Sequence, residues 1–360
     1  MVAERRDFLR ARTVAVLRPS PDRRAPVCPH VAGGCGGCTW PFVRAGAPEA
    51  ALKAGIVADA LRRIARLPDV PVAVAPPGVP EVGYRTTARL AVAADGRPVY
   101  RRRHGHEEVP VDTCRVAHPL LEELVVDGRF PGAAGVMLRV SAATGERVAC
   151  PDRRAAGVVV PPGTVVARPG DPRARVHEDV AGRRWRVSAE SFFQSGPAAA
   201  EALVRAVASA AAADLRPGVR IADLYAGVGV LGGAVASGCD GAVLAAVESG
   251  RAAAADAAHN LADLDARVLL GEVAAAAALV GGTDVVVADP ARSGLGPSAA
   301  ATIAGVGAPT VVLVSCDPAS LARDATLLGG HGYRLERVEV VDTFPSTFHV
   351  ETVSRFTTAR

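Results

Sequence analysis

Three short segments near the end of the 360-residue chain carry side chains that could perform covalent chemistry. Asp289 stands in VVVADPARSGLG, Cys316 in VVLVSCDPASLARD and Glu351 in DTFPSTFHVET. A cysteine thiolate can add to one carbon of a ring, and a carboxylate can then remove a proton from the neighbouring carbon so that the sulfur leaves. Cys316 as nucleophile and Glu351 as general base would perform such a substitution if both face the same ring.

The positions of these two residues bear on their reactivity. Cys316 follows an apolar strand and opens toward a helix, so we expect backbone N–H groups and the helix dipole to favour its thiolate. Glu351 would be a suitable base if partial burial raises its pKa. Taken separately, such a cysteine is usually a small core residue and such a glutamate is usually solvated. Only their combination favours a catalytic function.

A glycine-rich turn, DLYAGVGVLG, follows a predicted strand and opens a predicted helix. Gly227 and Gly229 let the backbone turn sharply beside a ligand, as nucleotide-type sites in parallel sheets require. The next strand ends at Glu248, which could accept hydrogen bonds from the ribose of an adenosine-containing cofactor or could only cap the following helix. These features do not distinguish S-adenosylmethionine from NAD.

Strands and helices alternate over residues 191–360, which predicts an α/β domain with a doubly wound parallel sheet. A long Ala-rich helix is expected over 198–213. Asp289, Cys316 and Glu351 fall beyond strand ends, where ligands bind in such sheets. The strand candidates are 219–224, 242–247, 268–270, 285–288, 310–315 and 338–341.

The first half of the chain has a different pattern of apolar residues and turn signals. Apolar residues recur at three and four over 47–65, which predicts a helix, and short alternating runs separated by turn signals make 72–187 mainly β. A Pro- and Gly-rich stretch over 161–175 is expected to be an exposed loop. The first 27 residues hold one strand-like run at 13–17 and are too few to fold alone.

Composition excludes some protein classes. The hydrophobic content of 49% indicates a folded protein, and no apolar run is long enough to span a bilayer. The N-terminus lacks the apolar core of a signal peptide, so we expect a cytoplasmic protein whose seven cysteines are not disulfide-bonded. The net charge of +4 comes mostly from Arg, but a high-GC genome explains much of this bias, so charge is weak evidence for a nucleic-acid partner.

In combination these segments resemble the bacterial RNA (uracil-5-)-methyltransferase family, which includes the 23S rRNA and tRNA enzymes. The resemblance covers nearly all of residues 15–360 and implies a Rossmann-like class I methyltransferase domain over 191–360. Its most specific parts, in the order that the family has them, are SFFQSG, DLYAGVG, ADPARSGLG, VSCDPASLARD and FPSTFHVET.

The resemblance assigns roles to individual residues. It makes Cys316 the nucleophile that adds to C6 of uracil and Glu351 the base that removes the C5 proton. Phe193 and Arg292 are expected to line the active site, and Phe193 is our candidate for supporting the target base. The residues expected to contact S-adenosylmethionine are Gln194, Tyr225, Gly227, Glu248 and Asp289.

Three cysteines spaced C-x6-C-G-G-C, Cys28, Cys35 and Cys38, together with Cys114, resemble the ligand set of a [4Fe–4S] cluster in that family. Their chemistry alone would suit tetrahedral zinc equally well, and the resemblance favours iron–sulfur. We expect residues 28–190 to form an iron–sulfur and RNA-binding central domain, with the cluster structural or RNA-positioning.

The chain departs from the family pattern in three places. DPPR reads DPAR, with Ala291, and the Cys common in DLYCG is Ala226; neither change removes a reacting group. Residues 1–27 resemble only the tail of the RNA-binding TRAM barrel, which implies either a short-form member or a start codon set too late.

These observations favour a monomeric enzyme that modifies 23S rRNA, because cluster-bearing members typically do so. A tRNA T-loop uridine is the alternative substrate. A cytosine-5 methyltransferase would usually have its cysteine in a Pro-Cys context, whereas this chain has SCDP. A non-catalytic RNA-binding assembly factor on the same scaffold is the alternative of another class, and the intact Cys316 and Glu351 argue against it.

Overall fold

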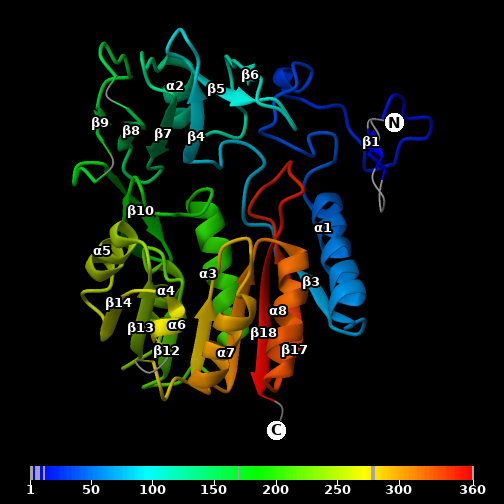
Figure 1. Cartoon of the computed structure of the whole chain (residues 1–360), viewed down its shortest axis with the longest axis vertical. Helices are drawn as coiled ribbons and strands as arrows, with labels where there is room; N and C mark the ends of the chain where they lie inside the picture. The colour runs from blue at the N-terminus through cyan, green and yellow to red at the C-terminus, as the bar shows by residue number, and fades with distance from the viewer. Residues whose placement is uncertain are drawn as a thin grey trace.

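The computed structural model describes residues 3–4, 9–10, 13–153, 155–168, 170–276 and 280–358. An eight-stranded sheet forms the lower lobe in Figure 1, and a six-stranded sheet forms the upper lobe. A two-stranded hairpin, β10 (Arg175–Val180) and β11 (Arg183–Ser188), connects them in sequence.

The eight-stranded sheet has the order β14-β13-β12-β15-β16-β18-β17-β3. Every residue of β15 and β16 is buried, as expected for apolar strands covered by helices on both faces. All six strands expected in this region are present, and the α/β class is confirmed. The strands are β3 (Val72–Val74), β12 (Arg220–Leu224), β13 (Val243–Glu248), β14 (Ala266–Leu270), β15 (Val285–Ala288), β16 (Thr310–Ser315), β17 (Tyr333–Val341) and β18 (Glu351–Thr358).

The expectation of a wholly parallel sheet was wrong, because the sheet is mixed. β18 runs antiparallel to both β16 and β17. The loop at residues 342–350 joins β17 directly to β18 without a crossover helix, and such a connection allows only antiparallel pairing. The reversal brings Glu351, the first residue of β18, to the edge where the parallel strands end.

Helices cover both faces of this sheet (Figure 1). On one face α3 (Pro197–Ala211), α4 (Val230–Ser237) and α5 (Arg251–Asn260) share a core with the hairpin residue Trp185. On the other face α7 (Gly296–Val306) and α8 (Pro318–Gly330) share a core with the N-terminal helix α1 (Ala47–Ala60) and its π-helical end, Leu61–Ala65. A short helix, α6 (Val273–Ala276), precedes β15.

The helix expected over 47–65 is confirmed, and it packs on the C-terminal sheet. Val57 and Leu61 are fully buried there, and burial of each such side chain stabilises the fold by about 1.5–3 kcal/mol. β3 likewise pairs with β17. Elements that sequence reasoning grouped with residues 28–190 therefore build part of the methyltransferase-like lobe.

The upper lobe is mainly β, as expected, but it contains a helix that the sequence analysis missed. This helix, α2 (Pro119–Asp127), packs Leu121 and Leu124 against the sheet. A short strand also lies within the loop expected over 161–175. The sheet has the order β6-β5-β4-β7-β8-β9, with β4 (Thr87–Val92), β5 (Pro98–Arg101), β6 (Glu108–Val109), β7 (Gly135–Val140), β8 (Arg147–Pro151) and β9 (Thr164–Val166).

The strand expected at 13–17 is absent from the structure. These residues pair with no segment among the described residues, and Val14 and Leu17 are 90% and 96% exposed. The short strands β1 (Ala3–Glu4) and β2 (Leu9–Arg10) pair with each other instead. Within the described ranges, none of the helices is both long and apolar enough to cross a bilayer.

Candidate active site

A cavity of about 480 Å³ opens at the edge of the eight-stranded sheet where the parallel strands end. Turns after β12, β15 and β16, the end of β13 and the start of β18 all meet here. Each catalytic and cofactor-binding residue predicted from the sequence lines this cavity. They are Gln194, Tyr225, Gly227, Glu248, Asp289, Cys316 and Glu351.

The glycine-rich turn brings α4 very close to the sheet. Tyr225 and Gly227 have positive φ angles of 66° and 56°, so the turn is tight where it faces the cavity. A Cβ atom on Gly232 would lie 2.6 Å from Cβ of Asp223, and one on Gly233 would lie 2.4 Å from Leu261. The run of glycines therefore serves both the turn and the packing of the helix that follows it.

Glu248 fits both readings given for it. Its Oε2 accepts a hydrogen bond from the backbone N–H of Gly227 at 2.8 Å, which fixes the glycine turn. Its Oε1 accepts one at 2.6 Å from the N–H of Gly250, the N-cap residue that directly precedes α5. The carboxylate thus supports a helix end and also lines the cavity.

Asp223 is a cavity residue that the sequence analysis missed. It is 1% exposed, and its Oδ2 accepts a hydrogen bond from Gly232 at 2.8 Å. Among the described residues nothing bonds to Oδ1, and burial together with the charges of Asp289 and Glu248 raises the pKa of Asp223 to about 7. The available signal was an acidic residue in an otherwise apolar strand, since such a group is rarely buried without a function or a partner.

Cys316 and Glu351 both line the cavity, and the charge of Glu351 acts on Cys316. Burial raises the pKa of Glu351 well above its usual range, and the charge of Asp289 raises it further. The direction of this pKa shift is the one expected from burial of a carboxyl group. Burial raises the pKa of Asp289 to about 7.

We expected the Cys316 thiolate to be stabilised, and for the protein without a bound ligand this expectation was wrong. Burial raises the pKa of Cys316 to about 11, and the charges of Glu351 and Asp289 add to the effect. The nearby Arg292 guanidinium favours the thiolate but does not outweigh these causes. At the start of α8, the N–H of Ser320 donates to the side chain of Asp317 at 2.7 Å, so that helix end is already satisfied.

The cavity is therefore complementary to a positive charge. Several acidic groups are crowded in it, and a bound cation would relieve their repulsion and favour their ionised forms. Among the residues that the structure describes, Oδ1 of Asp223 has no hydrogen-bond partner and a Cβ on Gly227 would meet nothing within 4 Å, which leaves room for such a ligand. The lining residues thus fit a cationic, adenosine-type cofactor.

The segment between β11 and α3 forms one wall of the cavity. The Nε2 atom of Gln194 donates to Oδ2 of Asp289 at 3.5 Å. Phe193 is buried, whereas its neighbour Phe192 is 67% exposed, and both line the cavity. The exposed aromatic is therefore Phe192 rather than the Phe193 singled out from the sequence.

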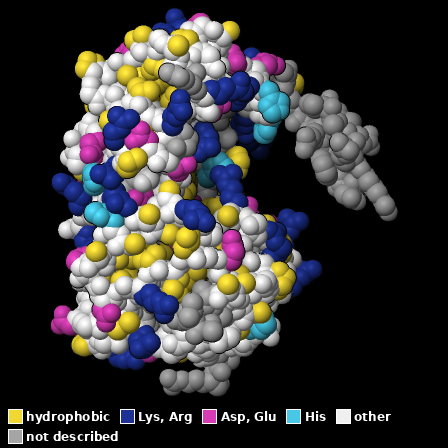
Figure 2. Space-filling view, turned by 60° about the vertical axis from the view of Figure 1, so that its left-hand side comes forward, with side chains coloured by type: hydrophobic (Ala, Val, Ile, Leu, Met, Phe, Trp, Pro, Cys, Tyr) yellow, Lys and Arg dark blue, Asp and Glu magenta, His cyan; other side chains and the backbone are white. Residues whose placement is uncertain are grey.

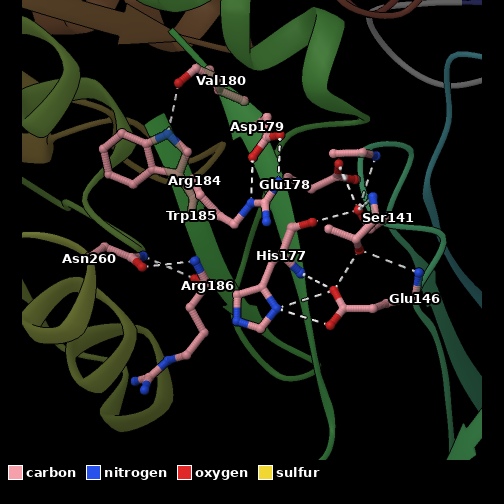
Figure 3. Close-up of polar contacts among 12 residues, drawn as sticks. Ser141, Glu146, His177, Glu178, Asp179, Val180, Arg184, Trp185, Arg186 and Asn260 are labelled. Carbon is pink, nitrogen blue, oxygen red and sulfur yellow. Dashed lines mark hydrogen bonds and ion pairs between the residues drawn. The ribbon is translucent and has the colours of Figure 1, made fainter. Parts of the chain in front are cut away.

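The β10–β11 hairpin holds this wall in place. Figure 3 shows Asn260 of α5 reaching the backbone of Arg186, with a 2.8 Å bond to its N–H and a 3.0 Å bond to its C=O. On the opposite strand, Glu146 of the upper lobe accepts a hydrogen bond from the His177 N–H at 2.7 Å. Buried Asp256 accepts a 2.7 Å bond from the Ser191 hydroxyl, two residues before Phe193. The hairpin thereby ties the upper lobe and α5 to the cavity wall.

The four predicted metal-binding cysteines meet at a second, smaller cavity of about 40 Å³. Cys28, Cys35, Cys38 and Cys114 all line it. Burial and the charges of the other three thiolates raise the pKa of Cys38 to about 12. In the described ranges, no group of three or more His, Cys, Asp or Glu side chains has an arrangement that could hold a metal ion.

Local structure explains why these cysteines converge. A Cβ on Gly36 would lie 2.8 Å from the carbonyl oxygen of Arg101, so glycine allows the C-G-G-C turn to lie against β5. Glu122 of α2 accepts a 2.6 Å hydrogen bond from the N–H of Cys114, and the Tyr100 hydroxyl lies 3.2 Å from its sulfur. The missed helix α2 therefore positions the distant fourth cysteine.

Comparisons with known proteins agree with this architecture. The chain is 37% identical to SCO5901, an uncharacterized RNA methyltransferase of Streptomyces coelicolor, over 96% of this chain and 81% of the relative. It is 32% identical to the 23S rRNA (uracil(1939)-C(5))-methyltransferase RlmD of Alkalilimnicola ehrlichii, over 98% and 87%. No family model matches the chain.

Among solved structures, the fold is similar to that of the Pyrococcus abyssi tRNA (uracil-54, C5)-methyltransferase in complex with S-adenosyl-L-homocysteine. The TM-score is 0.70 at 23% identity, and the match covers 95% of this chain and 88% of that one. This likeness concerns the fold, whereas the identity and coverage of the sequence relatives establish kinship. The chain belongs to the RNA methyltransferase family.

Proposed function

We propose that this enzyme transfers a methyl group from S-adenosylmethionine to C5 of a uridine in 23S rRNA. The observation that carries the proposal is a single cavity that joins the glycine turn to both Cys316 and Glu351. The related RlmD is named for uracil C5 methylation of 23S rRNA, and the structural neighbour is named for the same position of a tRNA uracil.

S-adenosylmethionine would be held by the residues around the glycine turn. Gly227, Glu248, Asp289 and Gln194, which line the same cavity, would contact it. The partnerless oxygen of Asp223 adds a further acceptor. When bound, this cofactor supplies the methyl group together with a positive sulfonium charge that the carboxylates of the cavity match.

The residues of the chain then act in sequence on the uracil ring. The Cys316 thiolate, favoured by the guanidinium of Arg292, adds to C6, and the electrons of the C5=C6 bond make C5 nucleophilic. After C5 has taken the methyl group, the Glu351 carboxylate removes the C5 proton. The C5=C6 bond forms again and the C6–S bond breaks, which returns the thiolate.

Access to this cavity requires that the target uridine leave its stack. Phe192, exposed at the cavity wall, offers an apolar surface for an unstacked base. Figure 2 shows Lys and Arg side chains on both lobes and along the junction between them, a distribution that suits phosphate contacts on either side of a flipped nucleotide. These features support RNA as the substrate.

The second cavity would hold a [4Fe–4S] cluster through Cys28, Cys35, Cys38 and Cys114. Four crowded thiols match the ligands of such a cluster, whose several atoms require wider ligand spacing than one ion does. Bound there, the cluster would tie the N-terminal segment to the upper lobe.

The direct test supplies the purified protein with methyl-labelled S-adenosylmethionine and either 23S rRNA or tRNA transcripts, followed by mass spectrometry of the digested RNA. We expect 5-methyluridine in the rRNA. Label in the tRNA T-loop alone would overturn the proposed substrate. Label on cytidine would overturn the proposed reaction, and absence of label in every RNA would favour an assembly factor.

A further inference from the structure

A fully buried ion pair on α1 contacts the loop that precedes Glu351. Lys53 and Glu49 are one turn apart, and both are 0% exposed. Both point at residues 342–350, the loop that rises toward the upper lobe in red in Figure 1. Nothing in the proposed reaction uses either residue, so their burial calls for another explanation.

Lys53 and Glu49 together hold this loop at three points. The Nζ atom of Lys53 donates to Oδ1 of Asp342 at 2.7 Å and to the carbonyl oxygen of Phe344 at 3.1 Å. It also forms an ion pair with Oε1 of Glu49 at 3.0 Å. Oε2 of Glu49 accepts a hydrogen bond from the N–H of Ser346 at 3.1 Å.

The loop held in this way forms part of the active site. It begins after Val341 and ends before Glu351, and these two residues are paired across β17 and β18. Phe344 and His349 within it line the large cavity. A shift of the loop would therefore move the cavity wall and the base at the end of the loop together.

The loop depends on such external contacts for its shape. Ser346 has a φ of 65°, a conformation that non-glycine residues adopt at a cost. Its carbonyl oxygen accepts a 2.9 Å bond from the N–H of Trp40, and the Phe348 N–H donates to Thr39 at 3.0 Å. Thr39 and Trp40 directly follow Cys38, so the segment that carries this cysteine contacts the same loop as Lys53.

We propose that Lys53 is a positioning residue for the Glu351 base. Its charge, paired with Glu49 and Asp342, holds residues 342–350 so that the carboxylate meets the C5 proton of the methylated uracil. This inference rests on the proposed function. A buried ion pair is a poor source of net stability compared with apolar packing, so its retention fits a requirement for one loop conformation.

A positioning role of Lys53 predicts that its loss affects release of the covalent RNA adduct more than formation of the adduct. Formation of the covalent RNA adduct needs Cys316, whereas its release needs Glu351. Loss of the Lys53 contacts should displace the base more than the nucleophile, because Glu351 directly follows the held loop whereas Cys316 directly follows β16. Misplacement of a reacting group by about 1 Å can slow a step about 100-fold.

The experiment follows adduct formation and decay in Lys53→Met by rapid quenching and denaturing electrophoresis. We expect formation within about twofold of the wild-type rate and decay slowed by about 10–100-fold. Arg355→Met is the matched control, because Arg355 lies on β18, the strand that Glu351 begins, in half-buried ion pairs with Asp214 and Glu336, and it does not line the cavity. That control should lower stability and leave the ratio of the two rates unchanged.

Equal slowing of both steps in Lys53→Met, or decay at the wild-type rate, would overturn the positioning role. If Lys53→Met does not fold, Glu49→Gln is the second variant, because it keeps the shape of the side chain and its contact with Ser346 while removing one charge. The ratio of the rates of adduct formation and decay in Glu49→Gln then decides. Failure of the wild-type protein to form any adduct or methylated uridine would instead count against the proposed function.

Discussion

The cavity at the strand ends measures about 480 Å³ and the cysteine cavity about 40 Å³, yet burial raises the pKa of a thiol in both. In the large cavity the neighbours of Cys316 are carboxyl groups and an arginine. In the small cavity the neighbours of Cys38 are three further thiols. The same physical cause therefore acts on two different sets of partners.

This difference indicates what each cavity is suited to bind. In the large cavity, acidic groups and a thiol lie beside a glycine turn. This combination suits a cationic cofactor and a reacting ring, because both need space and the reaction on the ring needs proton transfer. Four thiols close together, in a space too small for a substrate, suit a metal centre that replaces their protons. Changes at the two cysteines should thus have different consequences, and the following variants test that contrast in order of expected effect.

The largest effect is expected for Cys316→Ala. Removal of the nucleophile should lower methyl transfer by about 10³-fold or more, with RNA affinity within about twofold of wild type. Labelled-methyl incorporation and filter binding measure the two quantities. Cys239→Ala, which changes a thiol outside both cavities, should retain full activity. Substantial methylation by Cys316→Ala would contradict the assignment of the reaction to the large cavity.

Cys38→Ser should act on stability and metal content rather than on chemistry directly. We expect loss of iron and a lower melting temperature, by about 2–4 °C for each kcal/mol of lost binding energy. Iron analysis, visible absorbance and thermal unfolding provide the measurements. Cys150→Ser, at a buried thiol on β8, is the control that should keep the iron. Unchanged iron content in Cys38→Ser would argue against a cluster at these four cysteines.

Asp223→Asn tests the acidic character of the large cavity. The substitution keeps the size of the side chain but removes a charge beside the bound cofactor. A hydrogen bond to a charged group contributes about 1.5–3 kcal/mol, so affinity for S-adenosylmethionine should fall by about 10–100-fold. Calorimetry with the cofactor measures this loss, and Asp284→Asn at the opposite end of the sheet should have no effect. An unchanged affinity would show that Asp223 makes no contact with the cofactor.

The pH dependence of cofactor binding tests the same acidic groups without a substitution. Asp223 and Asp289 each have a pKa raised to about 7, so they are protonated below that pH and ionised above it. Because a cation prefers the ionised form, affinity should fall by about tenfold per pH unit below 7 for each carboxyl that must lose a proton. Calorimetry between pH 5.5 and 8 tests this. Constant affinity across that range would contradict the raised pKa values.

Much of the lower lobe was predictable because its strands and turns are local patterns. The apolar runs that became β15 and β16 and the glycine turn after β12 appear where the sequence indicated. The antiparallel β18 was not foreseen as a change of direction, since pairing partners depend on contacts between distant residues. The placement of α1 on the C-terminal sheet has the same origin.

The candidate site was also predictable as a set of residues, but its electrostatics were not. Sequence position suggested that the helix after Cys316 would favour a thiolate, and it gave no measure of burial or of the nearby Glu351 charge. Asp223 was overlooked because it lies inside an apolar strand. The contacts of Lys53 with residues 342–350 could not be foreseen, because almost 300 residues separate Lys53 from this loop.

The central claim is that Cys316 and Glu351 act on the same uracil ring. Glu351→Gln, incubated with S-adenosylmethionine and the RNA substrate, tests it most directly by electrophoresis under denaturing conditions. We predict that an RNA–protein adduct accumulates, because the C5 proton stays in place and the sulfur cannot leave, and that the additional change Cys316→Ala abolishes it. Normal turnover without an adduct, or an adduct that persists without Cys316, would contradict the account.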